Sequence, residues 1–185
     1  LRLVLALTAL NGLLGRTIIE LLPALSGQLL EGGSSELVVL VAMAGLGSVL
    51  GGVLVSRPAA DLARLMMLVC AAIMLAGLAL ISLQWFAGLV GLALWVSILS
   101  IVTTVAGTGS QTLIQLTASA EYRGRVMSLW TMLAMGAPAL GAALLGAGVD
   151  GFGFSHVAVW TGGVGVVLVI SLYARRSRVL VGSDP

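Results

Sequence analysis

Six long runs of hydrophobic residues follow one another along the chain, separated by short polar or charged segments. Each run is long enough for a helix to cross a bilayer, which takes about 20 residues. Helix is the expected conformation, because hydrocarbon offers no partner for an unpaired backbone N–H or C=O group. The predicted spans are residues 3–25, 37–55, 65–83, 87–116, 126–149 and 157–174. Residues 1–185 are therefore expected to form a single six-helix transmembrane domain.

Composition supports the same class. Hydrophobic residues make up 59% of the chain and charged residues only 9%, and the mean hydropathy is +1.16. Soluble domains are typically about 45–50% apolar and about 25% charged. The composition therefore predicts an all-α integral membrane protein that has the lipid bilayer as a partner. The 25 glycines, spread along the chain, are typical of membrane helices that pack closely.

Positive charge predicts the orientation of the spans, because cytoplasmic loops carry an excess of Lys and Arg. If six spans alternate, eight arginines fall on one side: Arg2, Arg57, Arg64, Arg123, Arg125, Arg175, Arg176 and Arg178. The loops of the other side carry Glu31, Glu36 and Asp150 and no positive residue. Both termini are therefore expected in the cytoplasm.

A stripe of polar residues runs along the fourth span. It consists of Ser97, Ser100, Thr104, Thr108, Gln111 and Gln115. Spacings of three and four residues place all six on one helix face. Such a face favours the lining of a path through the bilayer. The alternative is that the hydroxyls bond to carbonyls of their own helix or make contacts between helices.

Arg16 and Glu20 are the ionisable residues inside the first span, and their spacing of four residues lets them bond to one another. Charges at membrane depth are expected to face the bundle interior or a water-filled cavity. In one interpretation Glu20 takes up and releases a proton, while Arg16 binds an anionic group or tunes Glu20. In the other they are a structural ion pair. Asn11, one of the polar residues of this span, completes the candidate cavity lining.

A charged loop follows the fourth span and contains Glu121, Arg123 and Arg125. Arginines in such a position commonly anchor a loop on the cytoplasmic side. A second interpretation is a gating ion pair that involves Glu121. The sequence leaves both open.

The six spans also fall into two groups of three with similar character. The first and fourth carry the intramembrane polar residues, and the third and sixth are almost entirely apolar. The second and fifth carry small residues four apart: Ala44, Ser48 and Gly52, and Ala139, Ala143 and Ala147. A polar, small, apolar order that occurs twice with opposite topology predicts an inverted 3+3 repeat.

Two stretches carry a resemblance to a known family. Residues 15–24 read GRTIIELLPA, and residues 111–130 read QTLIQLTASAEYRGRVMSLW, with a Glu-x-Arg-Gly-Arg-Val-x-Ser loop at 121–128. With these stretches the chain resembles the C-terminal half of a major facilitator superfamily transporter. The branch is that of the exporters similar to the enterobactin exporter and the macrolide efflux pumps. The resemblance extends over essentially the whole chain.

The resemblance implies half of a twelve-helix secondary transporter in the bacterial inner membrane, whose first and fourth spans line a central cavity. It also implies efflux of a small-molecule substrate in exchange for protons, by alternating access against an N-terminal six-helix half. The chain starts with Leu and not Met, so we expect it to be part of a longer protein. The alternative is a self-sufficient six-helix protein that forms a homodimer around one pathway.

Other classes fit the sequence poorly. Ser110 and His156 lie on the spans that would carry the nucleophile and base of a rhomboid-type protease, but about 20 Å or more of helix separates their depths. A nucleophile and its base need to be about 3 Å apart, so we expect no enzyme. A Gly-x-x-x-x-Gly-Lys nucleotide loop and a basic tract for nucleic acid are both absent. With Cys70 as its one cysteine, the chain offers no CxxC metal site, and no cofactor is expected.

Overall fold

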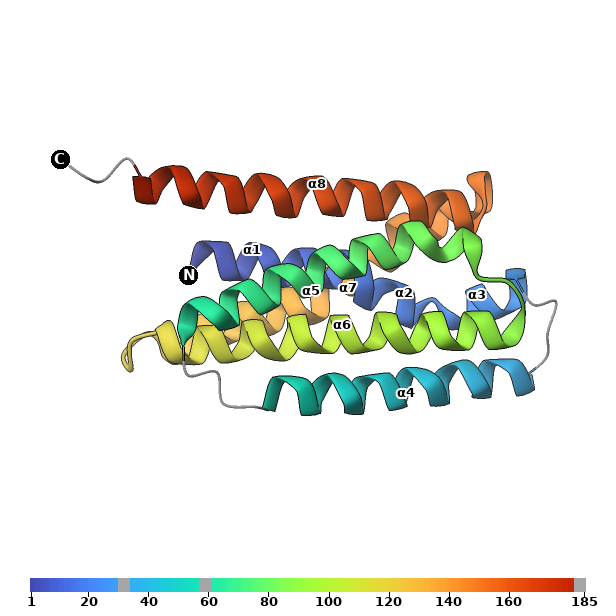
Figure 1. Ribbon diagram of the computed structural model, residues 1–185, viewed down its shortest axis with the longest axis horizontal. Coiled ribbons are helices and arrows are strands. Elements are labelled where there is room, and N and C mark those ends of the chain that lie inside the picture. The colour runs from blue at the N-terminus through green and yellow to red at the C-terminus, as the bar shows by residue number, and fades with distance from the viewer. Residues whose placement is uncertain (30–33, 57–60, 182–185) are drawn as a thin grey trace.

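The computed structural model describes residues 1–29, 34–56 and 61–181, and within these ranges the chain forms helices and no strand. Two helical segments depart from α geometry: Gly12–Arg16 is π-helical, and Leu83–Trp85 is a short 3₁₀ turn. The α-helices of Figure 1 are α1 (Arg2–Asn11), α2 (Thr17–Glu20), α3 (Leu22–Leu29), α4 (Ser34–Ser56), α5 (Leu62–Ser82), α6 (Gly88–Thr117), α7 (Arg123–Phe152) and α8 (Phe154–Val181).

Six helical stretches of the described chain are long and apolar enough to cross a membrane. They are Arg2–Glu20, Ser34–Ser56, Leu62–Trp85, Gly88–Thr117, Arg123–Val149 and Phe154–Leu172. The predicted all-helical, multi-pass membrane fold is thereby confirmed. The inverted 3+3 repeat and the half-transporter architecture stay predictions.

The first span ends earlier than expected because of Pro23. A proline has no N–H, and its ring clashes with the carbonyl four residues earlier, so it is tolerated in the first turn of a helix but not in the interior. Leu21 leaves helical geometry, with φ −88° and ψ 9°, and Pro23 then lies in the first turn of α3. The span expected at residues 3–25 is therefore interrupted at Leu21.

Much of the packing between helices involves α6 or α5. Helix α6 lies against α4 and α5, and α5 in turn lies against α8, while α1 contacts both α6 and α7 (Figure 1). Trp95 and Leu99 on α6, with Ile73 and Leu80 on α5, belong to one buried core. The Trp95 indole N–H donates to the Ala79 carbonyl at 2.6 Å. The largest fully buried side chain thus also satisfies its polar group, which joins α6 to α5.

Glycines allow α4 to lie directly on the backbone of α6. A Cβ atom at Gly47 would meet the backbone oxygen of Ser97 and would lie 2.9 Å from the Cβ of Ser100. At Gly51, one turn further on, a Cβ atom would lie 2.6 Å from the backbone oxygen of Ile101. Glycines four apart permit this kind of close approach between membrane helices.

Only some residues of the small-residue faces expected on the second and fifth spans pack against another helix. Ala44 is buried, but Gly52 has open space where its side chain would be, and Ser48 is half-buried. The three alanines expected in contacts on α7 are exposed: Ala139, Ala143 and Ala147. The spacing therefore predicted small faces, but it did not predict how each helix is rotated about its axis.

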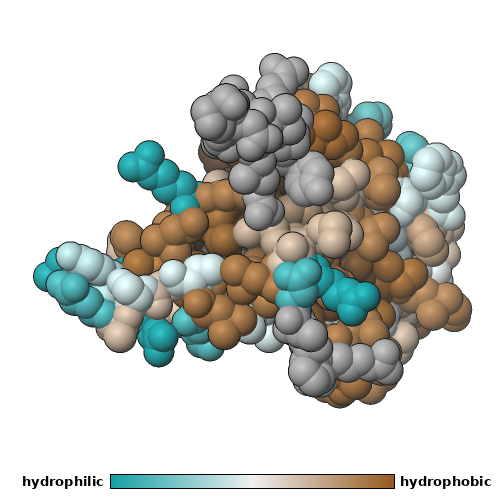
Figure 2. All heavy atoms as spheres, turned by 60° about the vertical axis from the view of Figure 1, so that its left-hand side comes forward, coloured by the Kyte–Doolittle hydropathy of each residue, from teal (hydrophilic) through white to brown (hydrophobic). Residues whose placement is uncertain are grey.

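Arginines gather at one end of the bundle. Arg2, Arg64, Arg123 and Arg125 lie in the first turns of α1, α5 and α7, which all begin at the same end (Figure 1). Figure 2 brings this end forward and shows separate hydrophilic residues set in a mostly hydrophobic surface. The predicted loop residues Arg57 and Glu31 lie outside the described residues. That this end faces the cytoplasm stays a prediction.

Candidate functional site: a polar cavity between the first span, α6 and α7

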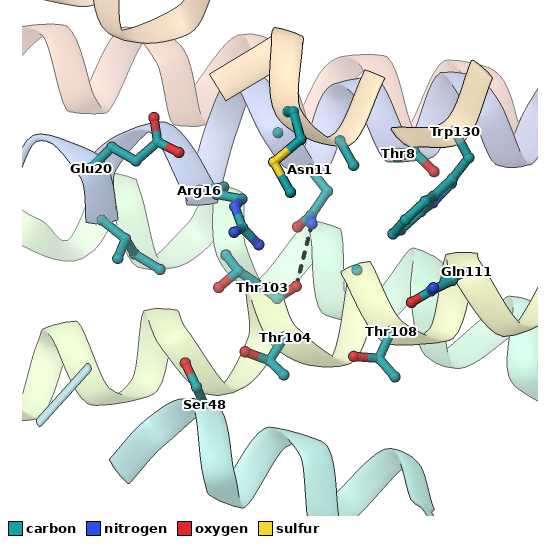
Figure 3. Close-up of a pocket in the computed structure, with 15 residues that line it drawn as sticks. Thr8, Asn11, Arg16, Glu20, Ser48, Thr103, Thr104, Thr108, Gln111 and Trp130 are labelled. Atoms are coloured by element: carbon teal, nitrogen blue, oxygen red, sulfur yellow. Dashed lines mark hydrogen bonds between the residues drawn. The ribbon is translucent and has the colours of Figure 1, made fainter. Parts of the chain in front are cut away.

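A cavity of about 330 Å³ opens between the first span, α6 and α7, with one side chain from α4 (Figure 3). Its lining consists of Thr8, Asn11, Gly12, Arg16, Ile19, Glu20, Ser48, Thr103, Thr104, Gly107, Thr108, Gln111, Trp130, Ala134 and Met135. Most of these residues carry a polar side chain, although the surrounding helices are almost entirely apolar. The cavity therefore concentrates polar groups at membrane depth, where such groups usually mark a functional site.

Two distant segments of the sequence meet in this cavity. Asn11, Arg16 and Glu20 come from the first span, and Thr104, Thr108 and Gln111 come from α6. A Cβ atom at Gly107, on the same face of α6, would lie 3.6 Å from the Asn11 Nδ2 atom. This distance is an ordinary van der Waals contact, so the first span and α6 pack directly against one another at this depth.

Ser97 and Ser100, which were also expected to line the cavity, lie elsewhere. Both are buried, and the contact between Gly47 and α6 covers them. α4 docks on the first turns of the stripe, so these two residues are not part of the cavity lining in this structure. Gln115, the last residue of the stripe, is exposed and lies outside the cavity lining.

The Arg16 and Glu20 side chains are both exposed in the cavity and point in different directions. Figure 3 shows the guanidinium extending toward α6 and the carboxylate turned away from it. Within the described part of the chain, no hydrogen bond or ion pair joins these two side chains. The structure thus does not contain the ion pair that their spacing allows, and each charged group is open to a molecule in the cavity.

Asn11 and Trp130 each carry a polar atom that has no hydrogen-bond partner among the described residues. The Asn11 Nδ2 group donates to the Thr103 carbonyl at 3.3 Å, while its Oδ1 atom and the Trp130 indole N–H are buried with no hydrogen bond. A buried polar group left in this state costs about 1–3 kcal/mol. Such exceptions are rare in folded proteins and call for a ligand, an ion or a water as partner.

Among the lining residues whose side chains carry a polar group, sequence reasoning missed four: Thr8, Ser48, Thr103 and Trp130. Thr8 lies three residues before Asn11 and could have been found by extending the polar face of the first span by one turn. Thr103 is adjacent to Thr104 and belongs to the neighbouring face of α6, so the strict spacing of the stripe excluded it. The sequence does not indicate that Ser48 and Trp130 line the cavity, because it is the docking of α4 and α7 that brings them there.

The remaining candidates lie away from the cavity. Glu121, Arg123 and Arg125 are exposed where α6 connects to α7, and no ion pair joins them among the described residues. Ser110 lies near the last turns of α6, where its hydroxyl donates to the Gly107 carbonyl at 2.9 Å. His156 lies at the start of α8, at the other end of the bundle (Figure 1). No cluster of three His, Cys, Asp or Glu residues occurs in the described part of the chain.

Cysteine labelling along α6 tests this arrangement. In a background with Cys70 replaced by alanine, cysteines at Thr108 and Gln111 are expected to react with a water-soluble maleimide, because both side chains line the open cavity. Cysteines at Ser100 and Leu113 are expected to stay unlabelled, because those positions have 0% exposure. The measurement is the extent of labelling in membrane vesicles. Equal labelling at all four positions would contradict the described cavity.

Comparison with known proteins adds no relative. No family model, no curated protein and no solved structure matches the chain. A functional conclusion therefore depends on two observations. One is the polar cavity in an apolar bundle, and the other is the pair of sequence stretches that resemble the major facilitator exporters.

Proposed function

We propose that this chain is the C-terminal six-helix half of a major facilitator-type secondary transporter that exports a small molecule from the bacterial cytoplasm in exchange for protons. The observation that carries the proposal is the cavity that contains an arginine and a glutamate, neither of which has an ion-pair partner among the described residues. Isolated charges inside a membrane domain are costly and mark substrate or ion pathways. The sequence stretches at 15–24 and 111–130 point to the same family.

The form of the first span supports a transport mechanism. A π-helical segment and a break at Leu21 interrupt this span where it meets the cavity. Interrupted helices that line a cavity near the middle of the membrane are typical of secondary transporters, which alternate access by rocking two units about that site. In this mechanism the chain would supply one wall of the site, and the second unit would close it.

The exposed small-residue faces of α4 and α7 are consistent with either of two partners as the second unit. Gly45 and Gly52 on α4, and Gly136 on α7, have open space where a side chain would be, and the α7 alanines are exposed. These small-residue faces fit an N-terminal six-helix half or a second copy of the chain. Flux from the chain alone would favour the second copy, whereas flux only with an added six-helix unit would favour the two-half transporter.

Flux in liposomes tests the function. The protein is reconstituted with a pH-sensitive dye inside the vesicles, and small organic acids, bases and neutral compounds are added in turn across an imposed pH gradient. At least one compound is expected to move protons through protein-containing vesicles and to accumulate in them, and a protonophore is expected to abolish this accumulation. If no compound crosses faster than in empty liposomes with either second unit present, the transport proposal is wrong.

A further inference from the structure

The Asn11 side chain is held in one orientation. It is only 6% exposed, and the one hydrogen bond that it forms with the described residues runs from Nδ2 to the Thr103 carbonyl. A carbonyl oxygen can only accept, so the amide nitrogen must face Thr103 and the Oδ1 atom must face away. This oxygen has no donor in the described part of the chain, and Asn11 lines the cavity. The cavity therefore contains an acceptor oriented in advance for a molecule that brings a donor.

The π-helical segment places Arg16 beside this acceptor. Side chains five residues apart on an α-helix point about 140° away from one another, since each residue turns by about 100°. In a π-helix the hydrogen bonds join residues five apart, so such residues lie about one turn apart on the same face. Gly12–Arg16 is π-helical, and Figure 3 shows the side chains of Asn11 and Arg16 both directed toward α6.

Arg16 supplies the charge of the site. Its guanidinium has no acidic partner among the described residues and lies in the open part of the cavity. A guanidinium has five donors in a planar arrangement that matches the two oxygens of a carboxylate. The carboxylate of Glu20, the one acidic side chain among the described lining residues, forms no ion pair with it (Figure 3).

We propose that Asn11 and Arg16 form a binding subsite for a small organic carboxylate that carries a hydroxyl group near its charge. The carboxylate binds the Arg16 guanidinium, and the hydroxyl donates to Asn11 Oδ1. The Trp130 ring forms another wall of the cavity, which suits a planar aromatic body. The subsite rests on the proposed transport function, because it names the substrate class of the same cavity.

Three probes separate the two contacts. 3-Hydroxybenzoate carries both groups, benzoate carries only the charge, and 3-hydroxybenzyl alcohol carries only hydroxyls. Binding is measured by calorimetry on the chain in phosphatidylcholine nanodiscs, where no anionic lipid competes for Arg16. We expect the protein to bind 3-hydroxybenzoate about 3- to 10-fold more tightly than benzoate, the usual effect of one neutral hydrogen bond.

Two substitutions assign the contacts. Asn11→Leu, which is similar in size and lacks the acceptor, is expected to remove the preference for 3-hydroxybenzoate and to leave benzoate binding unchanged. Arg16→Gln is expected to weaken both acids by about 10- to 100-fold and to leave the alcohol unaffected. Arg16→Lys restores part of the acid affinity. Ser110→Ala and Arg2→Gln are matched controls, because Ser110 is buried and Arg2 is exposed, and both lie outside the cavity.

The outcomes are distinct. A full preference for 3-hydroxybenzoate in Asn11→Leu, or equal acid affinities in Arg16→Gln and Arg2→Gln, would overturn the subsite. Asn11→Met gives the same test if Asn11→Leu does not fold. Flux is measured separately on the same proteins. If the proteins show the expected binding preferences but no flux, the subsite stands and the transport function is wrong. If they transport other compounds but lack these binding preferences, the transport function stands and the subsite is wrong.

Discussion

Replacement of Gly47 by leucine is expected to separate α4 from α6 and to lower the stability of the bundle by about 1–3 kcal/mol or more. The first added carbon would already meet the backbone oxygen of Ser97 and lie 2.9 Å from the Ser100 Cβ atom. A backbone oxygen cannot rotate away as a flexible side chain can, so the two helices have to move apart. The measurement is the midpoint of thermal unfolding in detergent, followed by circular dichroism.

Gly45→Leu is the matched control for this prediction. Like Gly47, Gly45 is a glycine of α4, but no atom lies within 4 Å of the position that its Cβ would take. In the chain alone, without a second unit, the added side chain would extend into open space, so the midpoint is expected to stay close to that of the unmodified protein. Equal losses in Gly45→Leu and Gly47→Leu would mean that α4 does not dock through Gly47.

Hydropathy was sufficient to predict six spans, because crossing a bilayer requires long apolar helices. It could not predict the rotation of each helix. In α4 the series through Ser48 and Gly52 fits a small-residue face as well as the series through Gly47 and Gly51 does. The contact with the Ser97 backbone, which is a property of two helices together, selects the second series.

For the same reason, the sequence alone could not predict which residues of the α6 stripe line the cavity. The α6 stripe is periodic from Ser97 onward, but only the docking of α4 determines that Ser97 is covered and Thr104 remains open. The alignment of Asn11 with Arg16 depends on a π-helical turn, which a period of 3.6 residues does not predict. By contrast, the meeting of polar groups from the first and fourth spans was accessible to sequence reasoning, since buried charges need a polar environment.

The Glu20→Gln variant is expected to lose proton-driven flux to the level of empty liposomes while it remains folded. Glu20 is the one acidic side chain in the cavity lining, it is exposed there, and no bond to another described residue occupies it. Glutamine has nearly the same shape and can still form hydrogen bonds, but its amide cannot take up or release a proton. The pathway should therefore still admit substrate, and only the link to the proton gradient should be lost.

Two flux measurements separate coupling from binding in this variant. Accumulation against an imposed pH gradient should disappear, whereas exchange of labelled for unlabelled substrate at equal pH should persist. Glu36→Gln, at the start of α4 and outside the cavity, removes the same charge and is expected to retain both activities. Retained accumulation in Glu20→Gln would exclude Glu20 as the coupling group. Loss of exchange as well would assign Glu20 to substrate binding, because a residue that only carries the proton is not needed for exchange at equal pH.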